Sequence, residues 1–195
     1  MECQNNLDIV EKDLRLACEA LERGEVILYP TDTVWGIGCD ATDPEAVRRV
    51  YDIKHRSDSK ALIVLVGSLD MLGQYVGRIP DEAYKFMADE RPTTMVLDGG
   101  KGLAPNLLAD DGSVGMRVTT ETFSKSLCLM FGRPIVSTSA NVSGMPAPSV
   151  YSEISSDILD AVDYVAVTRR GDTGKSMPSR IVKIDLNGNI QIIRS

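Results

Sequence analysis

The chain has 195 residues, of which 43% are hydrophobic and 25% charged, a composition typical of a folded globular protein with a sizeable core. The formal net charge of −7 disfavours a protein that holds nucleic acid through its overall charge, because phosphate binding needs clustered Lys and Arg. One histidine excludes a histidine-rich metal site, and four cysteines without a CxxC pair favour a reducing cytoplasm over a disulfide framework.

The first third of the chain predicts a helix, a strand and a second helix. Apolar residues at helical spacing indicate an amphipathic helix over 8–23, which Gly24 would end. Residues 25–29 (EVILY) indicate a strand that ends at Pro30. The stretch 42–45 (TDPE) matches a capping box and predicts a helix with Thr42 as its N-cap.

The rest of the chain alternates further strands and helices. Residues 61–66 (ALIVLV) form the longest apolar run, which suits a strand covered on both faces and is far too short to cross a membrane. The N-terminus lacks the features of a secretory signal. Further helices are predicted at 68–76, 81–90, 120–131 and 151–161, and strands at 93–98, 113–118, 134–138, 163–168, 179–185 and 190–194.

These elements predict a single domain over residues 1–195, with helices on a strongly twisted mixed sheet in three layers. Asn187-Gly188 between the last two strands is a strong hairpin signal. The fold class is therefore mixed α and β.

Two clusters in the first half could carry chemistry. Residues 30–41 (PTDTVWGIGCDA) follow a strand and combine hydroxyls, a carboxylate and glycines, which also suits a plain strand-to-strand connection. Residues 53–62 (IKHRSDSKAL) place Lys54, Arg56 and Lys60 close together, as a polyphosphate site would need. On the residues alone, a solvated basic loop at a helix C-terminus, where cations are favourable, is the preferred interpretation of the second cluster.

Two clusters in the second half follow or lie within strands. Arg117 lies in the strand VGMRV, where alternation turns it away from its apolar neighbours, toward solvent or into a site. Residues 137–144 (STSANVSG) offer four hydroxyls, an amide and a glycine at the end of a strand, a composition able to hold phosphate or carboxylate. Asp110 and Asp111 fit a turn better than an acid–base pair, and Trp35 fits a pocket wall or the core.

Taken in this order, the clusters resemble the YrdC-like threonylcarbamoyl-adenylate synthase family. The family pattern PT[DE]TVYG[LI]G corresponds to PTDTVWGIG at 30–38, and KxRxxxxPL to KHRSDSKAL at 54–62. The segment RPTTMVL at 91–97 stands where PGPxT is usual, VGMRV at 114–118 matches the AVRxP strand, and STSANVSG at 137–144 matches [ST]SANxSG. The resemblance therefore covers nearly the whole chain.

The resemblance implies an L-threonylcarbamoyladenylate synthase that uses L-threonine, bicarbonate or CO2, and ATP. Threonine's amine would capture bicarbonate as a carbamate, which would attack the α-phosphate of ATP and release pyrophosphate. Magnesium would accompany the ATP, with no protein metal site, and a separate transferase would pass the product to tRNA. Such chemistry needs positioning and charge neutralisation more than a side-chain nucleophile.

The resemblance also implies roles for individual residues, carried over onto matching positions. Thr31, Arg117, Ser139 and Ser179 would bind threonine, with Arg117 pairing its carboxylate. Lys54 and Arg56 would be catalytic. Lys54, His55, Arg56, Ser59, Ser113, Asn141, Ser149 and Arg194 would bind ATP.

This sequence departs from the family pattern at several positions. Pro92 stands at a turn where the family has Gly, and Arg180 follows Ser179 where the family has Thr. A catalytically weakened paralogue is therefore one alternative. A double-stranded RNA or tRNA-binding module that uses the same basic concavity is another, although the net charge of −7 disfavours it as the sole function. A carbamoyl-phosphate-handling relative is a third alternative, but such relatives carry extra domains in much longer chains.

Overall fold

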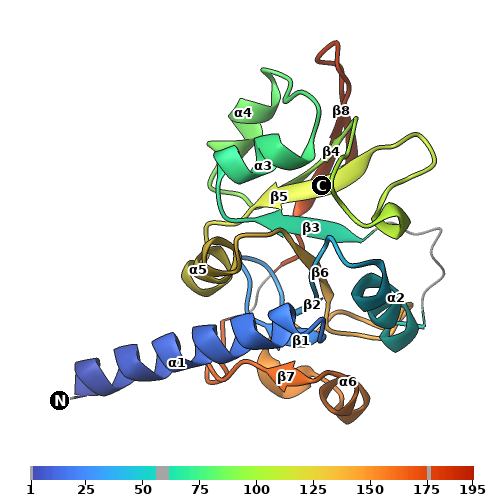
Figure 1. Ribbon diagram of the computed structural model, residues 1–195. Helices are drawn as coiled ribbons and strands as arrows, with labels where there is room; N and C mark the ends of the chain where they lie inside the picture. Colours follow the sequence, from blue (N-terminus) through green and yellow to red (C-terminus); the bar gives the residue numbers. More distant parts are fainter. Residues whose placement is uncertain (1, 56–61, 175–176) are drawn as a thin grey trace.

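The computed structural model of the chain describes residues 2–55, 62–174 and 177–195, and Figure 1 shows its helices around one sheet. The helices are α1 (Glu2–Glu22), α2 (Pro44–Ile53), α3 (Leu69–Tyr75), α4 (Ala83–Met87), α5 (Thr122–Phe131) and α6 (Ser156–Ala161), with 3-10 turns η1 (Pro105–Leu107) and η2 (Tyr151–Glu153). The strands are β1 (Ile27–Tyr29), β2 (Gly36–Gly38), β3 (Ile63–Val66), β4 (Thr93–Leu97), β5 (Val114–Val118), β6 (Ile135–Ser139), β7 (Tyr164–Val165), β8 (Arg180–Ile184) and β9 (Ile190–Arg194).

The nine strands form a mixed sheet in the order β7-β1-β2-β6-β3-β5-β4-β8-β9. The pairs β1–β7, β3–β5 and β4–β8 are parallel, and the remaining neighbours are antiparallel. The mixed α and β class predicted from the sequence is confirmed, as is the hairpin of β8 and β9 at one edge. Because β5 lies between β3 and β4, its side chains project from the middle of the sheet rather than from an edge.

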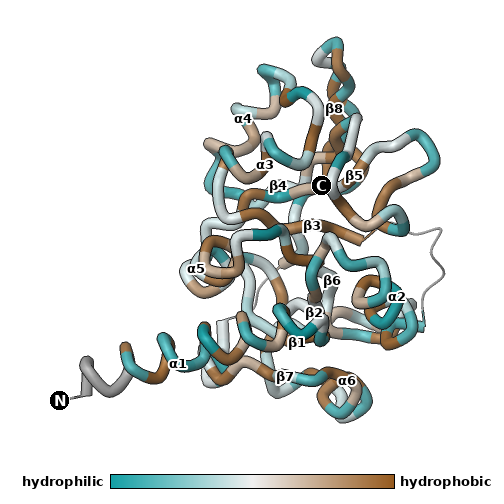
Figure 2. The backbone as a smooth tube through the Cα atoms, in the orientation of Figure 1, coloured by the Kyte–Doolittle hydropathy of each residue, from teal (hydrophilic) through white to brown (hydrophobic). Residues whose placement is uncertain are grey.

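The central strand β3 belongs to the apolar core, as its sequence predicts. Val64, Leu65 and Val66 are fully buried between the elements that cover the sheet. Figure 2 shows hydrophobic colour along β3 and mixed colour along α1, which presents its polar side to solvent. Burial on both faces explains the continuous apolar run, since neither side of this strand has to face water.

The predicted start of the second helix was wrong by one residue. Asp43, not Thr42, is the N-cap of α2, and its carboxylate accepts from the backbone N–H of Glu45 at 2.9 Å and of Ala46 at 3.4 Å. Thr42 instead donates its hydroxyl to Asp40 at 2.7 Å. A carboxylate directly before Pro44 reaches the free N–H groups of the first turn, so it takes the capping role.

Two further differences lie in the strands. The glycine-rich stretch after Pro30 contains β2, a short strand between β1 and β6 that the sequence does not mark with apolar alternation. A Cβ at Gly38 would overlap the carbonyl oxygen of Val136 and lie 2.7 Å from Tyr29, so only glycine fits there. The strand predicted at 163–168 is reduced to β7, and the helix predicted at 151–161 divides into η2 and α6.

Candidate functional site

A cavity of about 300 Å³ opens on the face of the sheet where β3, β5, β6 and β8 come together. Its polar lining comes from Thr33, Arg117, Ser137, Ser139, Asn141, Ser179 and Arg194. An apolar part of its wall is formed by Val34, Leu62, Ile63, Met145, Ala147 and Ile181. The cavity thus combines two cations and several hydroxyls with a hydrophobic surface, as sites for small charged metabolites do.

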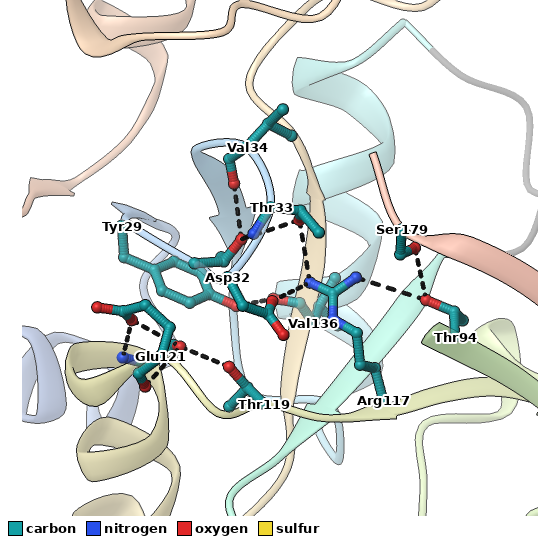
Figure 3. Close-up of polar contacts among 12 residues, drawn as sticks. Tyr29, Asp32, Thr33, Val34, Thr94, Arg117, Thr119, Glu121, Val136 and Ser179 are labelled. Carbon is teal, nitrogen blue, oxygen red and sulfur yellow. Dashed lines mark hydrogen bonds and ion pairs between the residues drawn. The ribbon is translucent and has the colours of Figure 1, made fainter. Parts of the chain in front are cut away.

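Arg117 is the buried cation of this cavity, 3% exposed, on β5, which is the neighbour of the central strand β3. Figure 3 shows its guanidinium between the residues of the turn after β1 and those of β4. It lies 2.9 Å from the carboxylate of Asp32 and donates to the hydroxyls of Thr33 at 3.2 Å and Thr94 at 3.4 Å. Its Nε is buried without a hydrogen-bond partner. A buried donor left without a partner is rare in proteins, so this guanidinium retains capacity for a ligand.

Asp32 is the carboxylate that faces Arg117, and its side chain is 7% exposed. Burial raises the pKa of the Asp32 carboxyl above its ordinary value, and the charge of Arg117 acts against that rise. Arg117 Nη2 and Asp32 Oδ1 are 2.9 Å apart and form an ion pair, although their geometry is not that of a hydrogen bond. The pair fixes the guanidinium without using all of its donors.

Ser179 and Arg194 line another part of the cavity, and the buried Thr94 lies behind Ser179. The hydroxyls of Thr94 and Ser179 are 2.9 Å apart, and Thr94 in turn accepts from Arg117. Arg194 donates to the carbonyl oxygen of Ser179 from Nε at 3.0 Å and from Nη2 at 2.7 Å. Burial, and next the charge of Arg117, lower the pKa of Arg194, so the two cations influence each other. Their combined charge exceeds that of Asp32 and favours an anionic ligand.

Lys54 is placed differently from the other predicted cations. It is 1% exposed, and its ammonium donates to the backbone carbonyl oxygens of Ser139 at 2.5 Å and Asn141 at 2.6 Å. The carbonyl oxygen of Lys54 also accepts from the N–H of Ser143 at 2.9 Å. Lys54 therefore fastens the C-terminus of α2 to the loop after β6, beneath the cavity lining.

Ser139 at the end of β6 and Asn141 in the loop after it both line the cavity. The side-chain N–H2 of Asn141 donates to the carbonyl oxygens of Val142 at 2.9 Å and Met145 at 2.6 Å, while its Oδ1 is buried without a partner. The Asn141 side chain thus holds the loop through two backbone carbonyls, and its Oδ1 is an acceptor without a partner.

Thr31 and Ser149 line a smaller hollow beside the main cavity rather than the cavity itself. The hydroxyl of Thr31 donates to Val34 O at 2.7 Å and accepts from Thr33 N at 3.1 Å, which holds the turn in shape. Trp35 also borders this hollow and packs on Tyr151, with ring centroids 5.0 Å apart. Both interpretations of this tryptophan therefore hold, because it is buried and also walls a pocket.

The turn after β1 is held from outside by Arg169, a residue with the left-handed φ of 64°. Arg169 donates to Thr31 O at 3.1 Å and lies 3.4 Å from the carboxylate of Glu121. Glu121 in turn caps α5 by accepting from the N–H groups of Phe123 and Ser124. This chain of contacts joins three distant segments around the polar turn.

The other predicted site residues are not brought into the cavity. Ser113 shares its face of β5 with Arg117 but lies at the far end, next to Asp111, whose carboxylate accepts from its N–H at 3.0 Å. Asp110 and Asp111 form a turn, as predicted. His55 follows Lys54, the C-cap of α2, has a φ of 47° and is exposed. Arg56 and Ser59 lie outside the described residues.

Some cavity residues were not assigned from the sequence. Thr33, Ser137 and Thr138 contribute hydroxyls to the lining, while Thr94 and Asp32 contact Arg117 from behind it, Asp32 as its counter-charge. Their motifs were visible in the sequence, but the strand register that sets Thr94 beside Arg117 was not. In residues 2–55, 62–174 and 177–195 there is no group of three or more His, Cys, Asp and Glu placed to hold a metal ion. Within those ranges, no helix is long and apolar enough to span a membrane.

The fold and the cavity define a mixed α and β protein whose cavity is lined by a buried arginine. The Sua5/YciO/YrdC family profile, described as telomere recombination, matches residues 19–195, and the chain belongs to this family. Threonylcarbamoyl-AMP synthase of Vibrio parahaemolyticus is 32% identical over 83% of this chain and 89% of its own length. The enzyme of that name from Pseudoalteromonas translucida is 34% identical over 92% and 97%, respectively.

Solved structures share the fold. E. coli YciO superposes with a TM-score of 0.80 at 25% identity, over 93% of this chain and 88% of its own. P. abyssi Sua5 complexed with L-threonine gives a TM-score of 0.76 at 25% identity, over 87% of this chain and 50% of its own. The chain therefore spans about half the length of that Sua5 protein.

Proposed function

We propose that this chain is an L-threonylcarbamoyladenylate synthase, a nucleotidyltransferase that makes threonylcarbamoyl-AMP and pyrophosphate from L-threonine, bicarbonate or CO2, and ATP. The observation that carries the proposal is the buried Arg117, which lines the cavity and whose Nε has no hydrogen-bond partner within the protein. An α-carboxylate would satisfy that donor, as arginine–carboxylate pairs commonly do. The matching relatives named threonylcarbamoyl-AMP synthase support the same activity.

Threonine would bind with its carboxylate on Arg117 and its hydroxyl near Ser179 or Thr94, which already contact each other at 2.9 Å. Its methyl group would contact the apolar wall, for example Ile63 or Ile181. That contact would favour threonine over serine by about 1–3 kcal/mol. The complex of P. abyssi Sua5 with L-threonine supports this ligand class.

The reaction would need no side-chain nucleophile. The amine of threonine combines with bicarbonate to give a carbamate and water, and a carbamate oxygen attacks the α-phosphorus of ATP while pyrophosphate leaves. Arg117 and Arg194 would offset the negative charge that accumulates among the reactants, and the rigid loop after β6 would keep them aligned. Mg²⁺ would be held by the ATP phosphates and water, since it dehydrates reluctantly and often binds through phosphate oxygens.

The remaining parts of the proposal concern residues and context. Ser139, Asn141 and Arg194 would contact ATP or threonine from the cavity wall, with Thr31 and Ser149 acting from the adjoining hollow. The roles of Arg56 and Ser59 toward the phosphates remain predictions from the sequence. One sheet that includes every described strand supports a single domain. We expect a cytoplasmic enzyme whose product is consumed by a separate transferase that modifies tRNA.

The decisive experiment measures pyrophosphate release from ATP with bicarbonate present, with and without L-threonine. We expect release that depends on threonine, and we expect serine to support it less well. ATP-dependent release that ignores threonine would contradict the assignment. No release, together with RNA binding that weakens steeply with salt, would instead favour the RNA-binding alternative.

A further inference from the structure

Arg180 occupies the first position of β8, directly after the cavity residue Ser179. Side chains alternate along a strand, so Arg180 points away from the face that carries Ser179 and Ile181. It therefore lies on the side of the sheet that α4 covers, outside the cavity and away from the reactants.

The guanidinium of Arg180 is held by three different groups. It donates to the hydroxyl of Thr93 from Nε at 3.1 Å and from Nη2 at 2.8 Å, and Nη2 also reaches the carboxylate of Asp89 at 2.7 Å. Its Cζ lies 4.9 Å from the ring centroid of Phe86 in α4. Its backbone N–H donates to Pro92 O at 3.0 Å. These contacts join the segment before β4 to the start of β8.

The two positions that depart from the family pattern are therefore in contact. Pro92 and Thr93 belong to the segment that stands in place of PGPxT, and Arg180 stands where the family has Thr. In the sheet, Thr93 is the register partner of Arg180 on the parallel strands β4 and β8. The start of β8 is thus joined to the segment before β4 by a register pair and by a backbone hydrogen bond.

The same strand ends carry, on their opposite face, the cavity residue Ser179 and its hydroxyl partner Thr94. Thr94 follows Thr93, Ser179 precedes Arg180, and their hydroxyls are 2.9 Å apart. Thr94 also accepts from Arg117, and Arg194 donates to the carbonyl oxygen of Ser179. Any shift between the ends of β4 and β8 would therefore change the Thr94–Ser179 contact and the support of both cavity arginines.

We propose that Arg180 is a positioning residue which, through Thr93, Asp89 and Phe86, sets the Thr94–Ser179 pair on the opposite face for substrate. The effect of Arg180 on catalysis rests on the proposed synthase function. Its structural part, the fixing of β8 against β4, does not depend on the identity of the substrate.

The test compares Arg180→Ala and Arg180→Lys with the wild type. We expect Arg180→Ala to weaken threonine binding by calorimetry about tenfold and to raise KM for threonine equally, with kcat and the KM for ATP changed less than about twofold. Arg180→Lys keeps the charge but loses the planar fork, so it should be intermediate. Thr93→Val should reproduce part of the effect, because it removes only the hydroxyl partner.

Arg133→Ala is the matched control, because Arg133 also pairs with a carboxylate, Asp40 at 2.6 Å, and stacks on a ring, Phe131 at 4.2 Å. Its contacts lie at the far end of β6 from the cavity. We expect this variant to lose thermal stability without a selective change in KM for threonine. An equal selective change in Arg133→Ala would mean that general loss of stability explains the Arg180 effect, and would overturn the proposal.

Amide hydrogen exchange supplies a measurement that needs no substrate. We expect exchange at residues 179–182 to accelerate in Arg180→Ala and to stay unchanged in Arg133→Ala. Unchanged exchange there, or unchanged threonine affinity in a protein that binds threonine, overturns the positioning role while leaving the synthase function standing. A wild type that neither binds threonine nor releases pyrophosphate refutes the function instead, and the exchange data still decide the role of Arg180.

Discussion

Lys54 and Arg117 are two buried cations that come from two of the sequence motifs, and their surroundings differ sharply. Lys54 is 1% exposed and Arg117 is 3% exposed, so burial alone does not separate them. Lys54 donates to two backbone carbonyl oxygens, at 2.5 and 2.6 Å. Arg117 contacts the side chains of Asp32 and two threonines, and it keeps a buried Nε without a partner.

The difference in partners leads us to expect different roles for the two cations. Backbone carbonyls cannot move aside without moving the loop after β6, so Lys54 helps to hold that loop in place. Hydroxyls and a carboxylate can share Arg117 with an incoming anion, and the cavity gives the anion access. The identity of a cation's partners, rather than its depth, therefore indicates whether it serves folding or binding.

Arg117→Ala should cause the largest loss and tests the binding half of the comparison directly. We expect the affinity for threonine to fall about 100-fold with a smaller effect on the KM for ATP, because a charge-assisted contact is lost. Calorimetry and steady-state pyrophosphate release measure the two effects, and circular dichroism checks the fold. A variant with a raised KM for ATP but unchanged affinity for threonine would contradict the pairing of threonine's carboxylate with Arg117.

Lys54→Ala tests the structural half. The family resemblance gives Lys54 a catalytic role, so turnover should be lost, and the contacts of Lys54 lead us to expect lost stability as well. We expect the free energy of unfolding to fall by about 2–4 kcal/mol, because two backbone carbonyls lose a charged donor. Urea unfolding measures this change. Full stability with abolished turnover would show that Lys54 acts on the substrate, as its sequence motif predicts, and the contrast with Arg117 would fail.

Asp32→Asn removes the counter-charge of Arg117 at nearly constant shape. We expect threonine affinity to fall about tenfold, since the guanidinium is no longer fixed by an ion pair. Because burial raises the pKa of Asp32, its carboxyl protonates at a higher pH than the ordinary value of about 3.9. Wild-type affinity should therefore weaken as the pH falls toward that raised pKa. The Asp32→Asn variant has no such group and should lack this step, and an identical pH profile for both proteins would contradict the assignment.

Asp111→Asn should have the smallest effect, because its ion pair with Lys183 is exposed. Hydrogen bonds from the Lys183 side chain, and from the side chain and backbone of Ser113, lower the pKa of Asp111. A lowered carboxyl pKa stabilises the folded state above the unfolded value of about 3.9, and this stabilisation is lost as the pH falls through the folded value. The difference in thermal midpoint between wild type and variant should thus be small at pH 7 and shrink below about pH 4. A difference in thermal midpoint that grows below about pH 4 would contradict this prediction.

Much of the fold follows from local pattern. The apolar run in β3, the Asn-Gly hairpin signal and the helical spacing of α1 each depend on a few neighbouring residues, and each was predicted correctly in kind. The cap of α2 was misplaced because Thr42 and Asp43 are both good N-caps, and only the contact of Thr42 with Asp40 decides between them. The strand β2 was missed because its glycines are required by close packing on Tyr29 and Val136, which are distant in sequence or lie on another strand.

The sequence by itself determined the polar motifs, the mixed fold class and the resemblance to a family, because those properties reside in short stretches of residue types. Only the tertiary structure decided which polar residues share the cavity, since that depends on strand register and on direction along each strand. Register sets Thr94 beside Arg117 and Thr93 opposite Arg180, so adjacent threonines serve opposite faces of the sheet. Tertiary packing likewise turned Lys54 toward backbone carbonyls and left Arg117 with a donor to spare.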